Sequence, residues 1–121
     1  MLSDAGLAAI AQAIVDPTAS PRAIYIEVGT GTNAPSAGDI SLQTPIIRKT
    51  LASWAHDAKK VTFTGWFNYS EAIATLKEAG VFIGGSATIG TGTLLSRIAI
   101  NRVKTGANTE TVEWTETLAS A

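Results

Sequence analysis

The first part of the chain spaces its apolar side chains as an α-helix does. Four of them recur at helical intervals and therefore share one face: Leu7, Ile10, Ala11 and Ile14. Ser3 and Asp4 are good N-cap candidates, because their side chains accept hydrogen bonds from the first free backbone N–H groups. Asp16 and Pro17 end the pattern, since a residue before proline avoids helical backbone. The sequence predicts one amphipathic helix of about three turns.

After the turn-rich residues 17–21 the hydrophobic period changes to two, which is typical of β-strands. The first strand alternates three apolar residues with two more polar ones: Ile24, Ile26 and Val28 against Tyr25 and Glu27. The predicted strands, separated by polar or glycine-rich turns, are residues 24–28, 46–54, 61–69, 72–83, 94–101 and 111–118. The connections between them are residues 30–44, 56–60, 84–92 and 105–108, and the first of these is a long surface loop.

Two of these strands need a further argument. Residues 72–83 have the alanine, leucine, lysine and glutamate content of a helix, but they end in Val-Phe-Ile before Gly84, which favours a strand. In residues 61–69, four large residues share the apolar face, Val61, Phe63, Phe67 and Tyr69, and Gly65 between them indicates a bulge or a close neighbour. Trp66 lies on the opposite, threonine-rich face, where an aromatic side chain is suited to contact another subunit.

The order of elements predicts a mainly β protein. About six strands without helices between them favour an antiparallel β-sandwich or barrel, preceded by one N-terminal α-helix. We expect residues 1–121 to form a single domain, with the helix in residues 1–16 and the β domain in residues 22–119. The predicted core contains Ile24, Ile26, Val28, Phe63, Phe67, Phe82, Ile98, Val112 and Trp114.

Composition narrows the classes of function. Only 16% of the 121 residues are charged and the formal net charge is -1, with no large basic cluster, so we expect no nucleic-acid partner. The chain has no cysteine, which excludes a disulfide or a thiolate metal site, and no apolar run is long enough to cross a membrane. A low charge content favours burial of surface in contacts with other proteins.

The sequence offers little catalytic chemistry. Residues 29–34 match the G-x-G-x-x-A form of a dinucleotide-binding loop, but Pro35 and Gly38 are unsuited to the helix that such a loop requires. The single histidine, His56, falls in a predicted polar turn, and Glu110, Glu113 and Glu116 project alternately from a strand. We therefore expect no cofactor, no metal site and no enzymatic activity.

Several segments together resemble small virion proteins of tailed bacteriophages. These are residues 28–39 (Val-Gly-Thr-Gly-Thr-Asn-Ala-Pro-Ser-Ala-Gly-Asp) followed by Leu42 and Arg48-Lys49, then residues 61–67, 74–82 and 92–97. The resemblance covers about residues 24–115. The N-terminal helix and residues 54–58 are not part of that pattern.

The resemblance implies a virion structural protein, and specifically a capsid decoration or cement protein that bridges capsomers on the phage head. The implied partners are further copies of the chain, as a homotrimer, and the major capsid protein; the implied location is the capsid surface, after synthesis in the host cytoplasm. A tail-fibre or baseplate component is the alternative within the virion, and a small ligand- or glycan-binding module is the alternative from another class. The expected interface residues are Leu7, Ile10, Ile14, Thr30, Asn33, Pro35 and Trp66.

Overall fold

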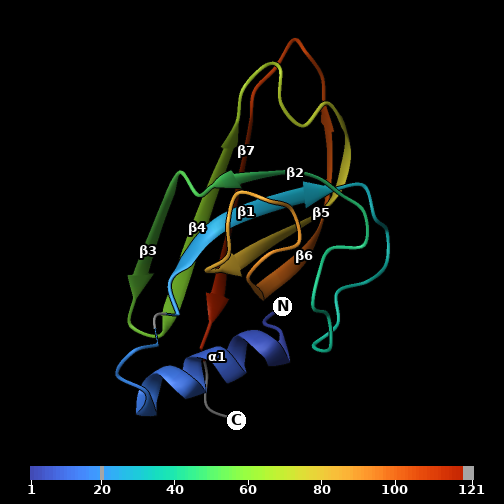
Figure 1. The fold of residues 1–121 in the computed structure, drawn as a ribbon. Coiled ribbons are helices and arrows are strands. Elements are labelled where there is room, and N and C mark those ends of the chain that lie inside the picture. The colour runs from blue at the N-terminus through green and yellow to red at the C-terminus, as the bar shows by residue number, and fades with distance from the viewer. Residues whose placement is uncertain (20, 119–121) are drawn as a thin grey trace.

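A computed structural model describes residues 1–19 and 21–118 as one helix and two antiparallel sheets (Figure 1). The elements are α1 (Asp4–Val15), β1 (Ala23–Gly29), β2 (Pro45–Thr50), β3 (Ser53–Asp57), β4 (Lys60–Phe67), β5 (Ala74–Ile83), β6 (Thr93–Lys104) and β7 (Glu110–Thr117). One sheet has the order β2-β1-β5-β6 and the other β3-β4-β7. The prediction of a mainly β, sandwich-like fold with an N-terminal helix is confirmed.

The core lies between the two sheets. The buried cluster combines apolar residues of β1, β4, β5 and β7, among them Ile26, Phe67, Val81 and Val112. Gly65 of β4 lets the sheets approach closely, because a Cβ atom there would lie 2.4 Å from a methyl carbon of Ile26. The sequence signal at Gly65 therefore marks a close neighbour from the opposite sheet.

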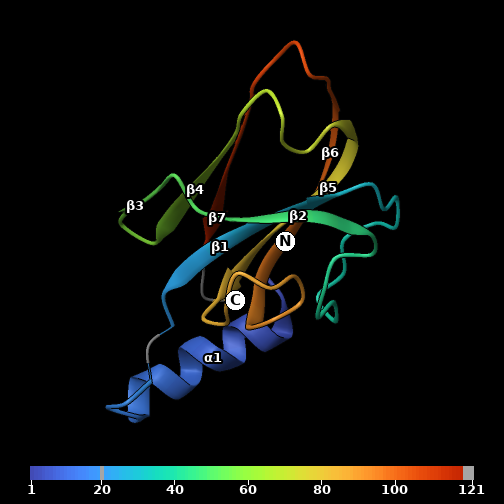
Figure 2. The same cartoon turned by 45° about the horizontal axis from the view of Figure 1, so that its top comes forward.

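The outward face of the four-stranded sheet is also buried, beneath the two long loops. Loop residues 30–44 and 84–92 lie over this sheet, as Figure 2 shows. Gly80 of β5 meets the loop directly, since a Cβ atom there would lie 2.8 Å from Leu42. Both faces of β1 and β5 are thus covered, which explains the long buried runs in these strands.

The helix is attached to the sheet mainly through its N-terminal end. The hydroxyl of Ser3 accepts a hydrogen bond from the backbone N–H of Gly6 and donates one to the carbonyl of Leu94. Gly6 is the buried residue of α1, because a Cβ atom there would lie 2.7 Å from Cα of Leu95. Leu2 forms a bridge with Ser96, so the segment before the helix pairs with the edge of β6.

The apolar face that the sequence predicts for the helix is only partly buried in the protein's own core. Ile10 is half-buried against the core cluster, but Leu7 is 44% exposed and Ile14 is 80% exposed. The close contact at Gly6 decides this rotation, since only the side of the helix without a large side chain fits against Leu95. Helix α1 therefore presents apolar side chains to solvent.

The predicted strand over residues 46–54 is two strands. β2 ends at Thr50 and β3 begins at Ser53, because the chain leaves the four-stranded sheet and enters the three-stranded one. His56 belongs to β3 and not to a connection; the turn lies at Ala58, whose φ is 52°, and Lys59. Seven strands result instead of about six.

Three further residues differ from the sequence interpretation. Tyr69 follows the end of β4 and is 60% exposed, so it is not on the apolar face. Glu27 and Arg97, which alternate with apolar residues, are buried and ion-paired.

Six predicted core residues are buried: Ile26, Val28, Phe63, Phe67, Phe82 and Val112. The other three, Ile24, Ile98 and Trp114, are half-buried. Leu118 lies just beyond β7, and residue 119 of the predicted β domain lies outside the described residues.

We predict that Phe67→Ala lowers the free energy of unfolding by about 3–5 kcal/mol, because it leaves a cavity in the centre of the sandwich. Phe67 has no exposed surface, whereas the adjacent Trp66 is 45% exposed on the outer face. Urea denaturation measures the change, and Trp66→Ala is the matched control with a much smaller loss. Equal losses for the two variants would contradict the assignment of the faces of β4.

Candidate functional site

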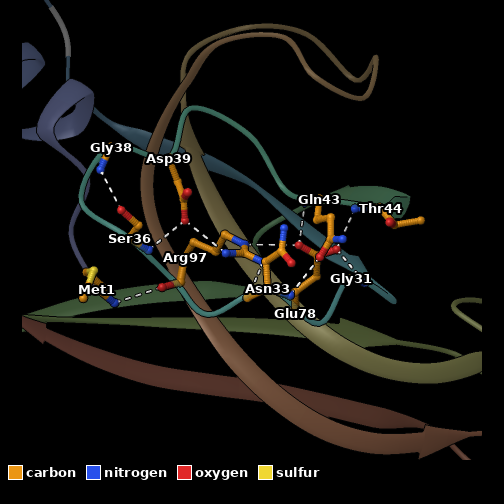
Figure 3. A network of polar contacts seen from close by, with 10 residues as sticks. All are labelled: Met1, Gly31, Asn33, Ser36, Gly38, Asp39, Gln43, Thr44, Glu78 and Arg97. Carbon is orange, nitrogen blue, oxygen red and sulfur yellow. Dashed lines mark hydrogen bonds and ion pairs between the residues drawn. The ribbon is translucent and has the colours of Figure 1, made fainter.

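A single buried carboxylate organises the long loop. Glu78 of β5 has no exposed surface, and its oxygens accept backbone hydrogen bonds from Gly31 at 2.8 Å, Gln43 at 2.8 Å and Thr44 at 2.7 Å (Figure 3). These donors belong to the two ends of the loop. The carboxylate therefore joins both ends of residues 30–44 to the centre of the sheet.

Arg97 of β6 extends this network across the sheet. Its Nε donates to Glu78 at 3.1 Å, one Nη donates to Asp39 at 3.0 Å, and the other Nη donates to the carbonyl of Asn33 at 2.9 Å (Figure 3). Arg97 is 3% exposed. The guanidinium thus compensates the buried charge of Glu78 and holds the middle of the loop as well as its ends.

The pKa of Glu78 reflects the competition between burial and hydrogen bonding. Burial acts to raise the pKa of Glu78, but the three backbone N–H groups and Arg97 together outweigh it and hold the pKa below its ordinary value. Glu78 is therefore a carboxylate in the folded protein, with its acceptor positions filled by protein donors.

A second buried ion pair holds the loop of residues 84–92. Arg48 of β2 donates to Glu27 at 2.7 Å and to the carbonyl of Thr91 at 2.7 Å, and the backbone N–H of Gly90 donates to Glu27 at 3.0 Å. The guanidinium also lies 4.6 Å from the ring of Tyr25 and 4.7 Å from that of Phe82. Both covering loops are thus fixed by a charge pair on the same sheet face.

The glycine-rich segment that resembles a nucleotide fingerprint is part of this arrangement. No helix follows residues 29–34; the chain continues as the loop. The backbone N–H of Gly31 points at the carboxylate of Glu78. An internal carboxylate thus occupies the position that a phosphate would take in a cofactor loop.

The expected interface residues lie in three separate places. On α1, Leu7 and Ile14 are exposed and Ile10 is half-buried. The three loop residues are Thr30 and Pro35, both half-buried, and Asn33, which is exposed. Trp66 is 45% exposed on β4, where the ammonium of Lys49 lies 5.2 Å from its ring centroid.

An apolar groove lies between α1 and the three-stranded sheet. Its volume is about 590 Å³, and its lining residues are Ile10, Pro21, Arg22, Ala23, Trp54, Ala55, His56, Val61, Phe63, Leu95 and Leu118. Trp54 is paired with Phe63 and His56 with Val61, so both β3 residues face inward, yet both are exposed. Arg22 lies 4.6 Å from the ring of Trp54. The groove is an uncovered part of the inner sheet face. This groove and the exposed helix are the candidate functional site.

A smaller, polar pocket lies within the loop. It measures about 270 Å³ and is lined by residues of the loop together with Arg97. The guanidinium donors that reach this region are bonded to Glu78, Asp39 and Asn33. This pocket therefore belongs to the network that fixes the loop.

The glutamates of β7 have local partners. Glu110 binds Arg102, Glu113 accepts from Thr64, and Glu116 accepts from Ser96. Among residues 1–19 and 21–118, no three histidine or acidic side chains gather in a way that could hold a metal ion. The same ranges contain no helix with the length and apolarity needed to cross a membrane.

Sequence reasoning missed the two buried ion pairs. Arg97 and Glu27 alternate with apolar residues, which is the pattern of a sheet with one solvated face. A signal was present in the run Ala79-Gly-Val-Phe-Ile83, which is apolar at successive positions and indicates a strand covered on both sides. A charged neighbour such as Glu78 then requires a buried partner.

We predict that Glu78→Gln lowers the free energy of unfolding at pH 7 by about 3–5 kcal/mol, because it removes the buried charge that pairs with Nε of Arg97, leaves Asp39 as the only carboxylate of the described residues beside that guanidinium, and takes one charged acceptor from the loop. In the wild type this contribution is complete above the ordinary glutamate pKa of about 4.3 and is lost as the pH falls through the lower folded pKa. Urea denaturation between pH 7 and pH 3 measures the free energy of unfolding of the wild type and of the variant.

The difference between the two proteins should therefore shrink below about pH 4.3. The pKa of Glu71 is lowered mainly by the backbone N–H of Asn68, and that of Asp16 mainly by the hydroxyl of Thr18, so both also destabilise the fold in acid. These effects are common to the wild type and the variant and cancel in the difference. A difference that is constant with pH would contradict the charged state of Glu78.

No family model, curated protein or solved structure matches this chain.

Proposed function

We propose that this chain is a virion structural protein of a tailed bacteriophage, and that it decorates the capsid by binding to neighbouring capsomers. The protein acts by adding contacts between other proteins, without catalysis. The observation that carries this proposal is the exposed apolar face of α1. The resemblance of residues 24–115 to small phage virion proteins supplies the biological setting.

The helix supports an assembly function because its composition is unsuited to a free surface. Of its twelve residues only Asp4 and Gln12 are polar, and α1 packs on the protein mainly near Gly6. Ile14 and Val15 are 80% and 82% exposed. Apolar side chains grouped on one element and exposed to this extent are characteristic of protein contact sites.

The internal charge pairs support the same function. Glu78, Arg97, Glu27 and Arg48 are buried and hold loops in place. The loop of residues 30–44 is consequently a fixed surface element that carries the exposed Ile40. A loop that is ordered before binding loses less conformational entropy when it docks.

Decoration stabilises a shell by mass action. A protein that binds assembled capsomers, and not separated ones, shifts the equilibrium toward the shell by an amount set by its concentration and affinity. A bridging protein needs two contact surfaces, one for each neighbour. The helix and the loop are separate elements and can supply them.

Two other functions remain as candidates. A tail-fibre or baseplate component would use the same surfaces in another part of the virion. A small ligand- or glycan-binding module is favoured by one observation, the apolar groove with Trp54 and Arg22 at its side. Saturable thermal shifts with glycans or small apolar ligands, abolished by Trp54→Ala, would favour this module over the virion proposal.

We expect gold-labelled antibodies against this protein to mark the head surface of phage particles purified from the source of the gene. Label confined to the tail would replace the capsid proposal with the fibre or baseplate alternative. Absence of label from particles that contain their other structural proteins would contradict a virion role.

We predict that Ile40→Asp weakens binding to undecorated phage heads by at least about tenfold. Burial of the new, unpaired carboxylate at the contact should cost more than about 1.4 kcal/mol of binding free energy. Ile40 is 75% exposed, so the fold should remain stable. Ile73→Asp is the matched control, since Ile73 is 57% exposed and lies outside both the loop and α1. Co-sedimentation with heads measures binding; equal binding by both variants would remove the loop as a contact element.

A further inference from the structure

The groove lies where β3, at the edge of the three-stranded sheet, extends beyond the elements that pack on the inner face of that sheet. β3 is an edge strand whose five residues are all exposed, although Trp54 and His56 point to the inner side of the sandwich. In a closed sandwich such positions pack against the opposite sheet. Here β2 pairs with β1 only from Tyr25 to Gly29, so beside Ala23 the opposite sheet ends at β1. Helix α1 lies at this end of the two sheets (Figures 1 and 2), and the groove remains between it and β3.

The bottom of the groove is part of the hydrophobic core. Ala23, Phe63 and Leu95 belong to the buried cluster, and Ile10 and Val61 pack against it. A volume of about 590 Å³ has room for several aliphatic side chains. The groove therefore suits an apolar ridge that completes the core, such as one face of a helix.

The same chain carries such a ridge. Leu7, Ala11, Ile14 and Val15 are all exposed and occupy one flank of α1, beside the line of Gly6 and Ile10 that packs on the protein. Leu7, Ala11 and Ile14 are spaced by four and seven residues, so they form one row along the helix. Both the groove and the ridge lack a partner within the described residues, and both are apolar.

The charges around the two surfaces are complementary. Residues 1–19 contain two carboxylates, Asp4 and Asp16, and no lysine, arginine or histidine. The lining of the groove includes the cation Arg22, and the backbone N–H of its residue Leu118 donates a hydrogen bond to the carbonyl of Lys59 in the adjacent turn. Asp57 is the one acidic residue among residues 53–60. The ammonium of Met1 is paired with Glu116, so the carboxylates of Asp4 and Asp16 set the charge of the helix ends, and their attraction to Arg22 at the groove favours association of helix and groove.

We infer that the groove of one copy binds helix α1 of a second copy, through Leu7, Ile14 and Val15. This inference deepens the proposed function, because it identifies the contact by which the structural protein assembles with itself. Each copy donates one helix and receives one helix. Repetition of this head-to-tail contact closes a ring such as a trimer, and a reciprocal exchange closes a dimer.

The first experiment compares point variants by light scattering coupled to size-exclusion chromatography over a concentration series. Ile14→Asp on the ridge and His56→Glu in the groove should each convert the oligomer to a monomer. Both positions are exposed, so circular dichroism and urea denaturation should show an intact fold. Ile73→Asp and Ser53→Glu are the controls and should remain oligomeric, since Ser53 lies on the outer face of the same strand as His56.

The second experiment tests the pairing of the two surfaces. The Ile14→Asp variant retains an intact groove and the His56→Glu variant retains an intact helix. An equimolar mixture of these two monomers should therefore form a 1:1 heterodimer with one remaining contact, whereas neither variant should dimerise alone. Deletion of the helix is less informative, because it would also uncover Leu95 and free the edge of β6.

A monomeric wild type, or an Ile14→Asp variant that remains oligomeric, would overturn the inference, and so would a mixture that stays monomeric. These results are distinct from failure of the proposed function. A wild type that labels phage heads but is monomeric contradicts only the inference. A wild type that forms the helix-dependent oligomer but labels no particle contradicts only the virion proposal.

Discussion

The Glu78 carboxylate is the interaction on which the arrangement of this protein depends. It lies in the middle of the central strand β5 and accepts hydrogen bonds from both ends of the long loop and from Arg97 on the neighbouring strand. Removing a charge from water is unfavourable unless its acceptor positions are filled. The carboxylate and the loop are therefore mutually required: the loop supplies the donors, and the buried charge prevents the loop from leaving the sheet.

A second ion pair holds the other loop at β1 and β2 on the same sheet face, although it is less completely satisfied, since one oxygen of Glu27 and Nε of Arg48 have no hydrogen-bond partner among the described residues. Glu27 and Arg48 bind the backbone of residues 90 and 91, so the loop of residues 84–92 is held by polar contacts. Two loops held by four buried charged side chains thus cover one face of the four-stranded sheet, without a third layer of regular structure. The opposite face packs against the smaller sheet in the ordinary apolar way.

This distribution of polar and apolar groups underlies the functional proposals. Charged residues that hold loops from inside are unavailable for catalysis at the surface, while large apolar residues remain outside on α1 and in the groove beside β3. The close contact between Gly6 and Leu95 rotates the helix so that its larger side chains face solvent. We propose that a protein with this surface is stabilised by binding other proteins, and that the ridge and groove make a second copy a suitable partner.

Local patterns were sufficient for much of the secondary structure. Alternation of residues 24–28 predicted β1, and the Ser3 cap and Asp16-Pro17 predicted the limits of α1. They were insufficient where the chain changes sheets between Thr50 and Ser53, because residues 46–54 contain no glycine or proline to mark the bend at Ala52. The exposed position of Trp66 was correctly predicted from its side of β4.

Most of the elements, the class of fold and most of the core could be predicted from the sequence, because these follow from the period of apolar residues along a single segment. The buried charges, the free face of α1 and the position of the groove became apparent only in the folded chain. Glu78 and Arg97 are nineteen residues apart, and Glu78 and Gly31 are forty-seven apart. Their contacts arise from sheet order and loop path, and no local pattern encodes the separation of groups that meet only when the whole chain is folded.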